Sequence, residues 1–104
     1  MTDDPDLTFV NDREHDRYLA QDGETVIGLI DYQVRDDDRH QRPRIVFAHT
    51  ETDPAYRGQG IAGRLTRYAL DDVTAAGLLL VPLCSYTQHY LREHPEYAGL
   101  LAEP

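Results

Sequence analysis

The sequence predicts a single α+β domain, in which antiparallel strands are followed by a helix, a strand and a second helix. Apolar residues between positions 26 and 34 suit a half-buried strand, whereas those from Ile61 onward recur at spacings of three and four, as on one helical face. An unbroken apolar run at 78–84 is typical of a buried strand. Because the chain has 104 residues, 40% of them hydrophobic, we expect residues 1–104 to form one domain around one modest core.

Strands are expected across the first half of the chain. Residues 7–21 are consistent with a broken pair of edge strands. Residues 24–34 carry the strongest strand signal, and "QDG" before them predicts a turn. The charged residues 35–44 predict an exposed loop, and residues 45–51 predict the next strand.

The second half predicts a strand–helix–strand unit. Gly77 lies where a C-terminal helix cap belongs, after the periodic residues Ile61, Leu65, Tyr68, Ala69, Val73 and Ala76. Pro82 argues for an edge, a bulge or a strand end in the apolar run that follows. If the two strands of residues 45–84 are parallel, they should lie side by side with a right-handed crossover.

A second helix is expected near the end of the chain. Ser85 and Gln88 have the spacing of a capping box. The helix should run from about residue 86 to 93 and stop before Pro95, because a residue that precedes proline disfavours the helical conformation. Residues 95–102 are consistent with a short last turn.

The net charge of −9 argues against nucleic acid and anionic membranes as partners, because both bind proteins mainly through Lys and Arg. Residues 1–55 hold 14 Asp and Glu against 6 Arg, and residues 56–104 hold 5 against 4. The second half is therefore nearly neutral, as a site for an anionic ligand requires. The acidic first half either attracts an amine or is simply a solvated surface.

The composition favours a cytoplasmic protein without disulfides or metal. Cys84 is the only cysteine, and the scattered histidines do not have zinc-ligand spacing. The first residues, "MTDDPDL", do not have the pattern of a signal peptide, and no apolar run approaches the roughly 20 residues that span a bilayer. We expect a monomer, or a homodimer formed through an exposed edge strand.

The segment "RGQGIAG", residues 57–63, stands between a predicted strand and a predicted helix. The first turn of a helix leaves backbone N–H groups unpaired at the positive end of its dipole, and glycines let the backbone approach a phosphate closely. The spacing matches neither the Walker pattern nor the dinucleotide-binding fingerprint. On these grounds the segment is either an anion-binding loop or a turn that merely needs glycine.

The wider stretch "DPAYRGQGIAGRL" resembles the acetyl-CoA signature of the GNAT N-acetyltransferase superfamily. That signature is Arg or Gln, two variable residues, Gly, one variable residue, then Gly or Ala, and Arg57, Gly60 and Ala62 stand at its defined positions. The resemblance implies acetyl-CoA as cosubstrate, with its pyrophosphate on backbone amides at about residues 59–63. The implied binding residues are Arg57, Gly58, Gln59, Gly60, Ile61, Ala62, Gly63 and Arg64.

Together with "HTETDPAYRGQGIAG" and "VPLCSYTQHYLREHPEY", the small size resembles the short, single-domain branch of this superfamily. The resemblance implies a twisted, mixed, mostly antiparallel sheet with helices packed on it. It also implies that the two helices that usually follow the first strand are missing, because "REHDRYLAQDGETVIG" leaves no space for them. The amine-binding wall that those helices supply would then be missing too.

His49 and Glu51 are two residues apart on a predicted strand, so their side chains should share a face. Acetyl transfer to an amine needs a base, since an ammonium group cannot attack a thioester. Glu51 resembles the glutamate that often serves as this base in the superfamily, and His49 ordinarily has a pKa nearer neutrality. The alternative is a pair of solvated residues at a strand end.

Cys84 and two tyrosines complete the candidate catalytic set. The thiol of Cys84 would face the acyl group if its strand neighbours that of His49, and the next helix N-terminus would lower its pKa. A buried structural cysteine is the alternative. Tyr86 and Tyr90 lie one helical turn apart, and many members use a tyrosine of the last helix to protonate the CoA thiolate; we favour Tyr90.

These residues favour an acetyl-CoA-dependent N-acetyltransferase that acts on an unidentified small-molecule or peptide amine. Glu51 or His49 would deprotonate the amine for direct transfer, or Cys84 would first take the acetyl group. The alternative function is a non-catalytic CoA-binding module that serves as a sensor or an assembly subunit. A third possibility is a structural domain whose glycines only shape a turn.

Overall fold

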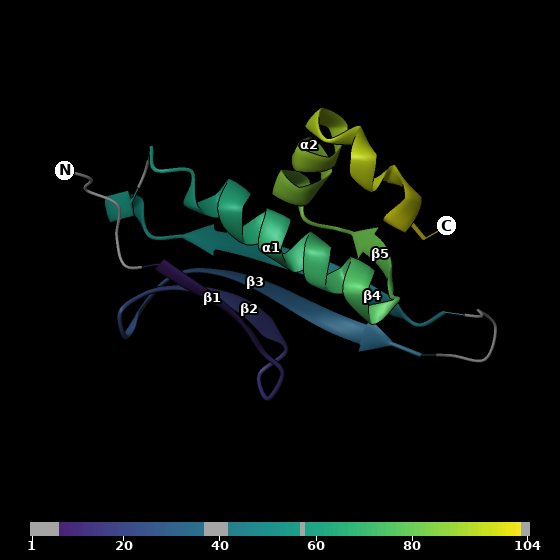
Figure 1. The fold of residues 1–104 in the computed structure, drawn as a ribbon, viewed down its shortest axis with the longest axis horizontal. Helices are drawn as coiled ribbons and strands as arrows, with labels where there is room; N and C mark the ends of the chain where they lie inside the picture. The colour runs from purple at the N-terminus through teal and green to yellow at the C-terminus, as the bar shows by residue number, and fades with distance from the viewer. Residues whose placement is uncertain (1–6, 37–41, 57, 103–104) are drawn as a thin grey trace.

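The computed structural model describes residues 7–36, 42–56 and 58–102, and these form a five-stranded sheet in the order β1-β2-β3-β4-β5 (Figure 1). The strands are β1 (Leu7–Asp12), β2 (Arg17–Asp22), β3 (Thr25–Arg35), β4 (Arg44–Thr52) and β5 (Leu79–Pro82). β1 to β4 are antiparallel neighbours, and β5 is parallel to β4. The predicted mixed, mostly antiparallel sheet is therefore confirmed.

One detail of the strand prediction is wrong, because only β1 of the first hairpin lies at the edge of the sheet. β2 pairs with β1 on one side and with β3 on the other. Its alternating residues Tyr18 and Ala20 are fully buried, as an inner strand requires. The predicted charged loop at 35–44 lies partly outside the described residues.

Two helices follow, α1 (Ile61–Ala76) and α2 (Ser85–Glu93), with 3-10 turns at Pro54–Tyr56 and Pro95–Leu100. Gly77 ends α1 in the left-handed conformation, with φ of 73°, and donates its N–H to the Thr74 carbonyl, which confirms the predicted cap. Neither helix of the described residues combines the length and apolar character that crossing a bilayer requires.

The predicted capping box at the start of α2 is wrong. Cys84 is the N-cap residue, Ser85 is already helical, and the start has no side-chain capping bond. Gln88 donates its amide to the carbonyl of Pro82 at 2.8 Å instead of reaching back to the cap. The cap falls one residue early because the N–H of Cys84 is held by the Phe47 carbonyl, which turns the chain out of the sheet there.

The helices lie on one side of the sheet (Figure 1). Their core combines the sheet residues Tyr18, Ala20, Ile27, Ile30, Tyr32, Ile45, Phe47 and Leu80 with helical residues that include Leu65, Val73 and Tyr90. Because side chains alternate along a strand, the intervening residues point to the opposite face. We call this opposite face the open face; it carries Leu19, Leu29, Asp31, Val46, His49 and Glu51, and no described helix covers it.

The parallel pairing of β4 and β5 is short, and this shortness shapes the region that follows. It joins Arg44–Phe47 to Leu79–Pro82, after which β5 ends while β4 continues to Thr52. The N–H groups of Leu83 and Cys84 both bind the carbonyl of Phe47, at 3.0 and 3.1 Å. Pro82 is thus the last residue of an edge strand, which agrees with two of the three alternatives predicted for it, although the strand is shorter than the apolar run at 78–84. The far half of β4 has no described strand on the β5 side.

A polar cluster ties the first hairpin to the C-terminal half of α1. The hydroxyl of Tyr18 donates to Asp72 at 2.8 Å, and Asn11 donates to the same oxygen at 3.2 Å. Tyr32 donates to the side-chain carbonyl of Asn11 at 2.6 Å. Burial, followed by the bond to Asp72, raises the pKa of Tyr18, so the phenol remains a neutral donor to the carboxylate.

We predict that Tyr18→Phe destabilises the fold by about 1–3 kcal/mol, because a part-buried hydrogen bond to a charged group is lost. The midpoint of urea unfolding should fall without a change in slope. Tyr97→Phe is the matched control, since Tyr97 makes the same type of bond to Asp71, at 2.7 Å, on the exposed surface. Equal losses in the two variants would contradict a structural role for the buried cluster.

Candidate active site

A pocket of about 220 Å³ opens at the head of α1, where the glycine-rich segment meets the end of β4. It is lined by Thr52, Tyr56, Gly58, Gly60, Ile61, Ala62, Gly63 and Tyr86. Five of these residues belong to the predicted acetyl-CoA-binding set. The pocket therefore lies where the sequence predicted an anion-binding loop, and α2 adds Tyr86 to its wall.

The backbone of the pocket explains the need for glycine. Gly58 and Gly60 have φ of 85° and 69°, a left-handed conformation that side chains with a Cβ adopt only at a cost. Nothing lies within 4 Å of a Cβ built at either position, so a ligand can approach the main chain.

The helix start also decides which amides are available. The N–H of Arg64 binds the carbonyl of Gly60 at 3.0 Å, so the amides of residues 61–63 precede the first helical bond. The N–H of Gln59 donates to the carbonyl of Tyr56 at 3.3 Å. This amide was one of those predicted to bind the pyrophosphate, and it already has a partner.

The structure places neither arginine of the predicted set in the pocket. Arg57 lies outside the described residues. The guanidinium of Arg64 lies 5.7 Å from the centre of the Phe9 ring on β1, and Arg64 does not line the pocket. The loop is anchored instead by Tyr56, whose hydroxyl donates to Asp22 at the end of β2 at 2.6 Å.

Cys84 lies at the N-cap of α2, with its thiol 3.3 Å from the hydroxyl of Thr50 on β4. Burial acts to raise the pKa of the thiol. Hydrogen bonds from the Thr50 hydroxyl, the N–H groups of Thr87 and Tyr86, and the Thr87 hydroxyl outweigh that effect and lower the pKa below its ordinary value. The predicted effect of the helix N-terminus on the pKa of the thiol is confirmed in direction.

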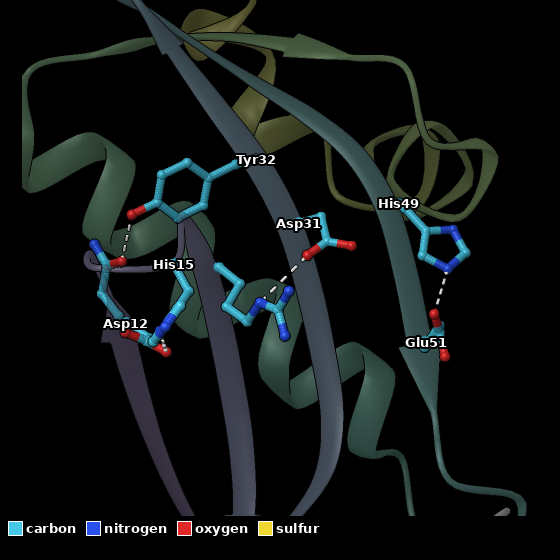
Figure 2. A network of polar contacts seen from close by, with 8 residues as sticks. Asp12, His15, Asp31, Tyr32, His49 and Glu51 are labelled. Carbon is cyan, nitrogen blue, oxygen red and sulfur yellow. Dashed lines mark hydrogen bonds and ion pairs between the residues drawn. The ribbon is translucent and has the colours of Figure 1, made fainter.

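His49 and Glu51 lie on the open face, as Figure 2 shows, and a nitrogen of the imidazole, Nε2, is 2.8 Å from Glu51 Oε2. Their side chains are 55% and 64% exposed, so solvent and an acceptor can reach both. In the sheet register His49 stands opposite Asp31, and Glu51 stands opposite Leu29. The predicted shared face is confirmed, and Glu51 is placed to orient the imidazole.

Cys84 and the His49–Glu51 pair approach β4 from opposite faces. Thr50 pairs with the buried Ile30 and so points toward the helices, where it meets Cys84. The adjacent residues His49 and Glu51 point to the open face. Because β5 ends at Pro82, the edge of β4 beyond Phe47 has no described strand on the β5 side.

The two candidate tyrosines of α2 have different surroundings. Tyr86 lines the glycine pocket, with its hydroxyl 3.5 Å from a Cβ built on Gly63. Tyr90 is 8% exposed and stacks on His94, with ring centres 4.0 Å apart. Burial raises the pKa of both phenols, so each would be a neutral proton donor near pH 7.

A sequence profile described as GCN5-related N-acetyl-transferase matches residues 17–100, most of the chain. The chain belongs to this family. Membership of the family makes the protein an N-acetyltransferase and confirms the resemblance that the glycine segment carried. The match includes the pocket, Cys84 and the His49–Glu51 pair.

Individual relatives agree with this assignment. Protein NATD1 of Mus musculus is 37% identical over 82 residues, which are 79% of this chain and 74% of that protein. A GCN5-like protein of Staphylococcus aureus, solved by NMR, superposes with a TM-score of 0.66 at 16% identity, over 99% of this chain and 93% of that one. Arabidopsis thaliana Naa50, solved with the bisubstrate analogue CoA-Ac-MVNAL, gives 0.53 at 16% identity, over 80% and 56%. At these identities the two structures show a shared fold.

Two residues of this N-acetyltransferase site were missed by sequence reasoning. Thr50 stands between His49 and Glu51, and strand alternation around the predicted pair was the signal that it points to the other face. Thr87 is fully buried, and its hydroxyl is one of the groups that lower the pKa of the Cys84 thiol. Both hydroxyls face Cys84.

We predict that Thr50→Val raises the pKa of Cys84, because the hydroxyl that favours the thiolate is removed while the shape is kept. The rate of iodoacetamide alkylation, followed against pH by mass spectrometry, should show its midpoint at higher pH, with the same limiting rate at high pH. Thr50→Ser keeps the hydroxyl and should retain the midpoint of the unmodified protein. An unchanged midpoint in Thr50→Val would show that Thr50 does not stabilise the thiolate.

Proposed function

We propose that this N-acetyltransferase takes its acetyl group from acetyl-CoA and passes it through Cys84 to an amine. The observation that carries the proposal is the glycine-lined pocket at the head of α1, with the thiolate-favouring environment of Cys84 at the start of α2. One group of residues would bind the donor, and the other would receive the acetyl group.

Acetyl-CoA fits the pocket on chemical grounds. Its pyrophosphate is anionic, and the amides of residues 61–63, which precede the first helical hydrogen bond, lie at the positive end of the α1 dipole. The left-handed Gly58 and Gly60 let phosphate oxygens approach the main chain. The bisubstrate analogue bound to Naa50, which contains CoA, supports the same donor for this chain.

In the first step the Cys84 thiolate attacks the thioester carbon of acetyl-CoA. A bond forms between Cys84 Sγ and the acetyl carbon, the bond from that carbon to the CoA sulfur breaks, and CoA leaves as a thiolate. The proton donor that we assign to this leaving group is Tyr86, which stands in the first turn of α2 two residues after Cys84. Tyr90, which the sequence analysis favours, is instead buried and stacked on His94. One thioester replaces another, so the step is chemically balanced.

In the second step the amine attacks acetyl-Cys84. The nitrogen–carbon bond forms, the Cys84 Sγ–carbon bond breaks, and the cysteine returns as a thiolate. His49 accepts the proton that the amine loses, and Glu51 orients the imidazole through their 2.8 Å contact. The proposal requires that the amine reach acetyl-Cys84 around the edge of β4 beyond Phe47, which has no described strand on the β5 side.

Direct transfer is the second candidate mechanism, and the exposed His49–Glu51 pair favours it. The imidazole would then deprotonate an amine that attacks acetyl-CoA itself, and Cys84 would only line the pocket. Family membership argues against the CoA-binding module that lacks activity. The lowered pKa of Cys84 favours the stepwise route over direct transfer.

We predict that Ala62→Glu weakens acetyl-CoA binding at least about tenfold, a difference of roughly 1.4 kcal/mol, because a carboxylate would face the pyrophosphate. Isothermal titration calorimetry measures the dissociation constant. Ala75→Glu places the same residue on an exposed position near the end of the same helix and should bind like the unmodified protein. No binding of acetyl-CoA to the unmodified protein at near-millimolar ligand would refute the donor itself.

We predict that incubation with acetyl-CoA and no amine adds one acetyl group to Cys84. Intact mass spectrometry should show the adduct, and subsequent addition of a reactive amine should remove it. Cys84→Ala should form no adduct and lose at least about 100-fold in kcat, as expected when a nucleophile is lost. A fully active Cys84→Ala variant would establish direct transfer instead.

A further inference from the structure

We propose that a shallow pocket beside Glu51 binds the acceptor, and that this acceptor is a short aliphatic amine with a second positive charge. The inference rests on the proposed acetyl transfer and names its substrate class. The pocket has a volume of about 120 Å³ and is lined by Val26, Ile27, Gly28, Leu29, Glu51, Thr52 and Asp53. It lies between the start of β3 and the end of β4.

The pocket shares a wall with the candidate base. Glu51 lines it and is also 2.8 Å from the imidazole of His49. Leu29 stands directly opposite Glu51 in the sheet register, so both side chains face the same way. An amine held in this pocket therefore lies beside the group that takes its proton.

The charged groups around the pocket favour a cation. Glu51 and Asp53 line it, and Asp31 follows along β3. Of the described cationic groups, Arg17 lies 3.5 Å from Asp31, and His49, which is cationic only when protonated, contacts Glu51. Two carboxylates thus stand at the pocket itself, while the guanidinium of Arg17 is directed to Asp31.

A second charge on the acceptor follows from the chemistry of the reaction. The attacking amine must be neutral, so it cannot balance both carboxylates while it reacts. Asp53 is held in place, because its Oδ1 accepts the N–H of Ala55 at 2.9 Å and its own N–H donates to Ile27 at 2.8 Å. An ammonium group at the far end of the acceptor would pair with Asp53 while the near end reacts.

The size and lining of the pocket favour an alkyl chain between the two nitrogens. Its volume of about 120 Å³ is well below the roughly 300–1,000 Å³ of pockets for drug-sized ligands. Val26, which is 43% exposed, and Leu29 supply the apolar surface that methylene groups cover. A linear diamine matches this combination of charge, length and apolar contact, whereas an aromatic or acidic acceptor does not.

The test compares butane-1,4-diamine with butylamine, which has the same chain without the second charge, and with 4-aminobutanoate, which carries a negative charge. CoA release measures turnover with acetyl-CoA. We expect kcat/KM for the diamine to exceed that for butylamine at least about tenfold. Asp53→Asn should abolish that preference by raising KM for the diamine, so that kcat/KM for the diamine falls to about that for butylamine.

Asp53→Asn keeps the oxygen that accepts the Ala55 N–H, so the variant changes charge more than geometry. Asp36→Asn, at the opposite end of β3, removes an equal charge and should leave the preference intact. Equal kcat/KM for the diamine and butylamine would overturn the inference. A higher kcat/KM for a peptide whose only charged side chain is one lysine than for the diamine would overturn it too.

The inference and the proposed function fail in distinguishable ways. Binding of acetyl-CoA and acetylation of Cys84 require no acceptor. If both occur and the diamine is not preferred, the acceptor class is wrong and the donor half of the reaction stands. If acetyl-CoA does not bind, the proposed function fails, and the acceptor inference fails with it.

Discussion

The carbonyl of Phe47 accepts hydrogen bonds from the N–H groups of both Leu83 and Cys84, and the arrangement of the site depends on this point. The double contact stops the parallel ladder at Pro82 and turns the chain into α2. Cys84 thereby becomes the N-cap of a helix and lies against Thr50 of the neighbouring strand. Had β5 continued beside β4, the thiol would be one more residue of a closed sheet.

The separation of the strands also divides the chemistry between two faces. On the helix side, the glycine pocket provides the amides at the start of α1, Tyr86 provides a neutral phenol and Cys84 provides a thiol of lowered pKa. On the open face, His49 and Glu51 form the proposed base pair, and Asp53 adds negative charge at the end of β4. Donors of hydrogen bonds thus surround the place proposed for an anion, and acceptors surround the place proposed for an amine. The uneven charge of the two halves of the sequence anticipates this division.

The sequence predicted the features that depend on neighbouring residues, and it missed those that depend on residues distant in the chain. The α1 helix, its Gly77 cap and the strand at 25–35 were predicted because periodicity and glycine conformation act over a few residues. The inner position of β2 and the cap at Cys84 were not, because each depends on a partner distant in the chain. β2 becomes an inner strand only when β3 pairs with it, and Cys84 becomes a cap only because Phe47 holds its amide.

The candidate site shows the same division. The sequence alone located the glycine segment and the His49–Glu51 pair, since a signature and a two-residue spacing are local features. Only the tertiary structure brought Thr50 and Thr87 to the thiol, placed Tyr86 in the pocket and turned Arg64 toward Phe9. It also joined Val26 and Leu29 to Glu51 and Asp53 in one pocket. These contacts link residues far apart in the chain, and their geometry is set by strand register and helix packing, which no short stretch of sequence contains.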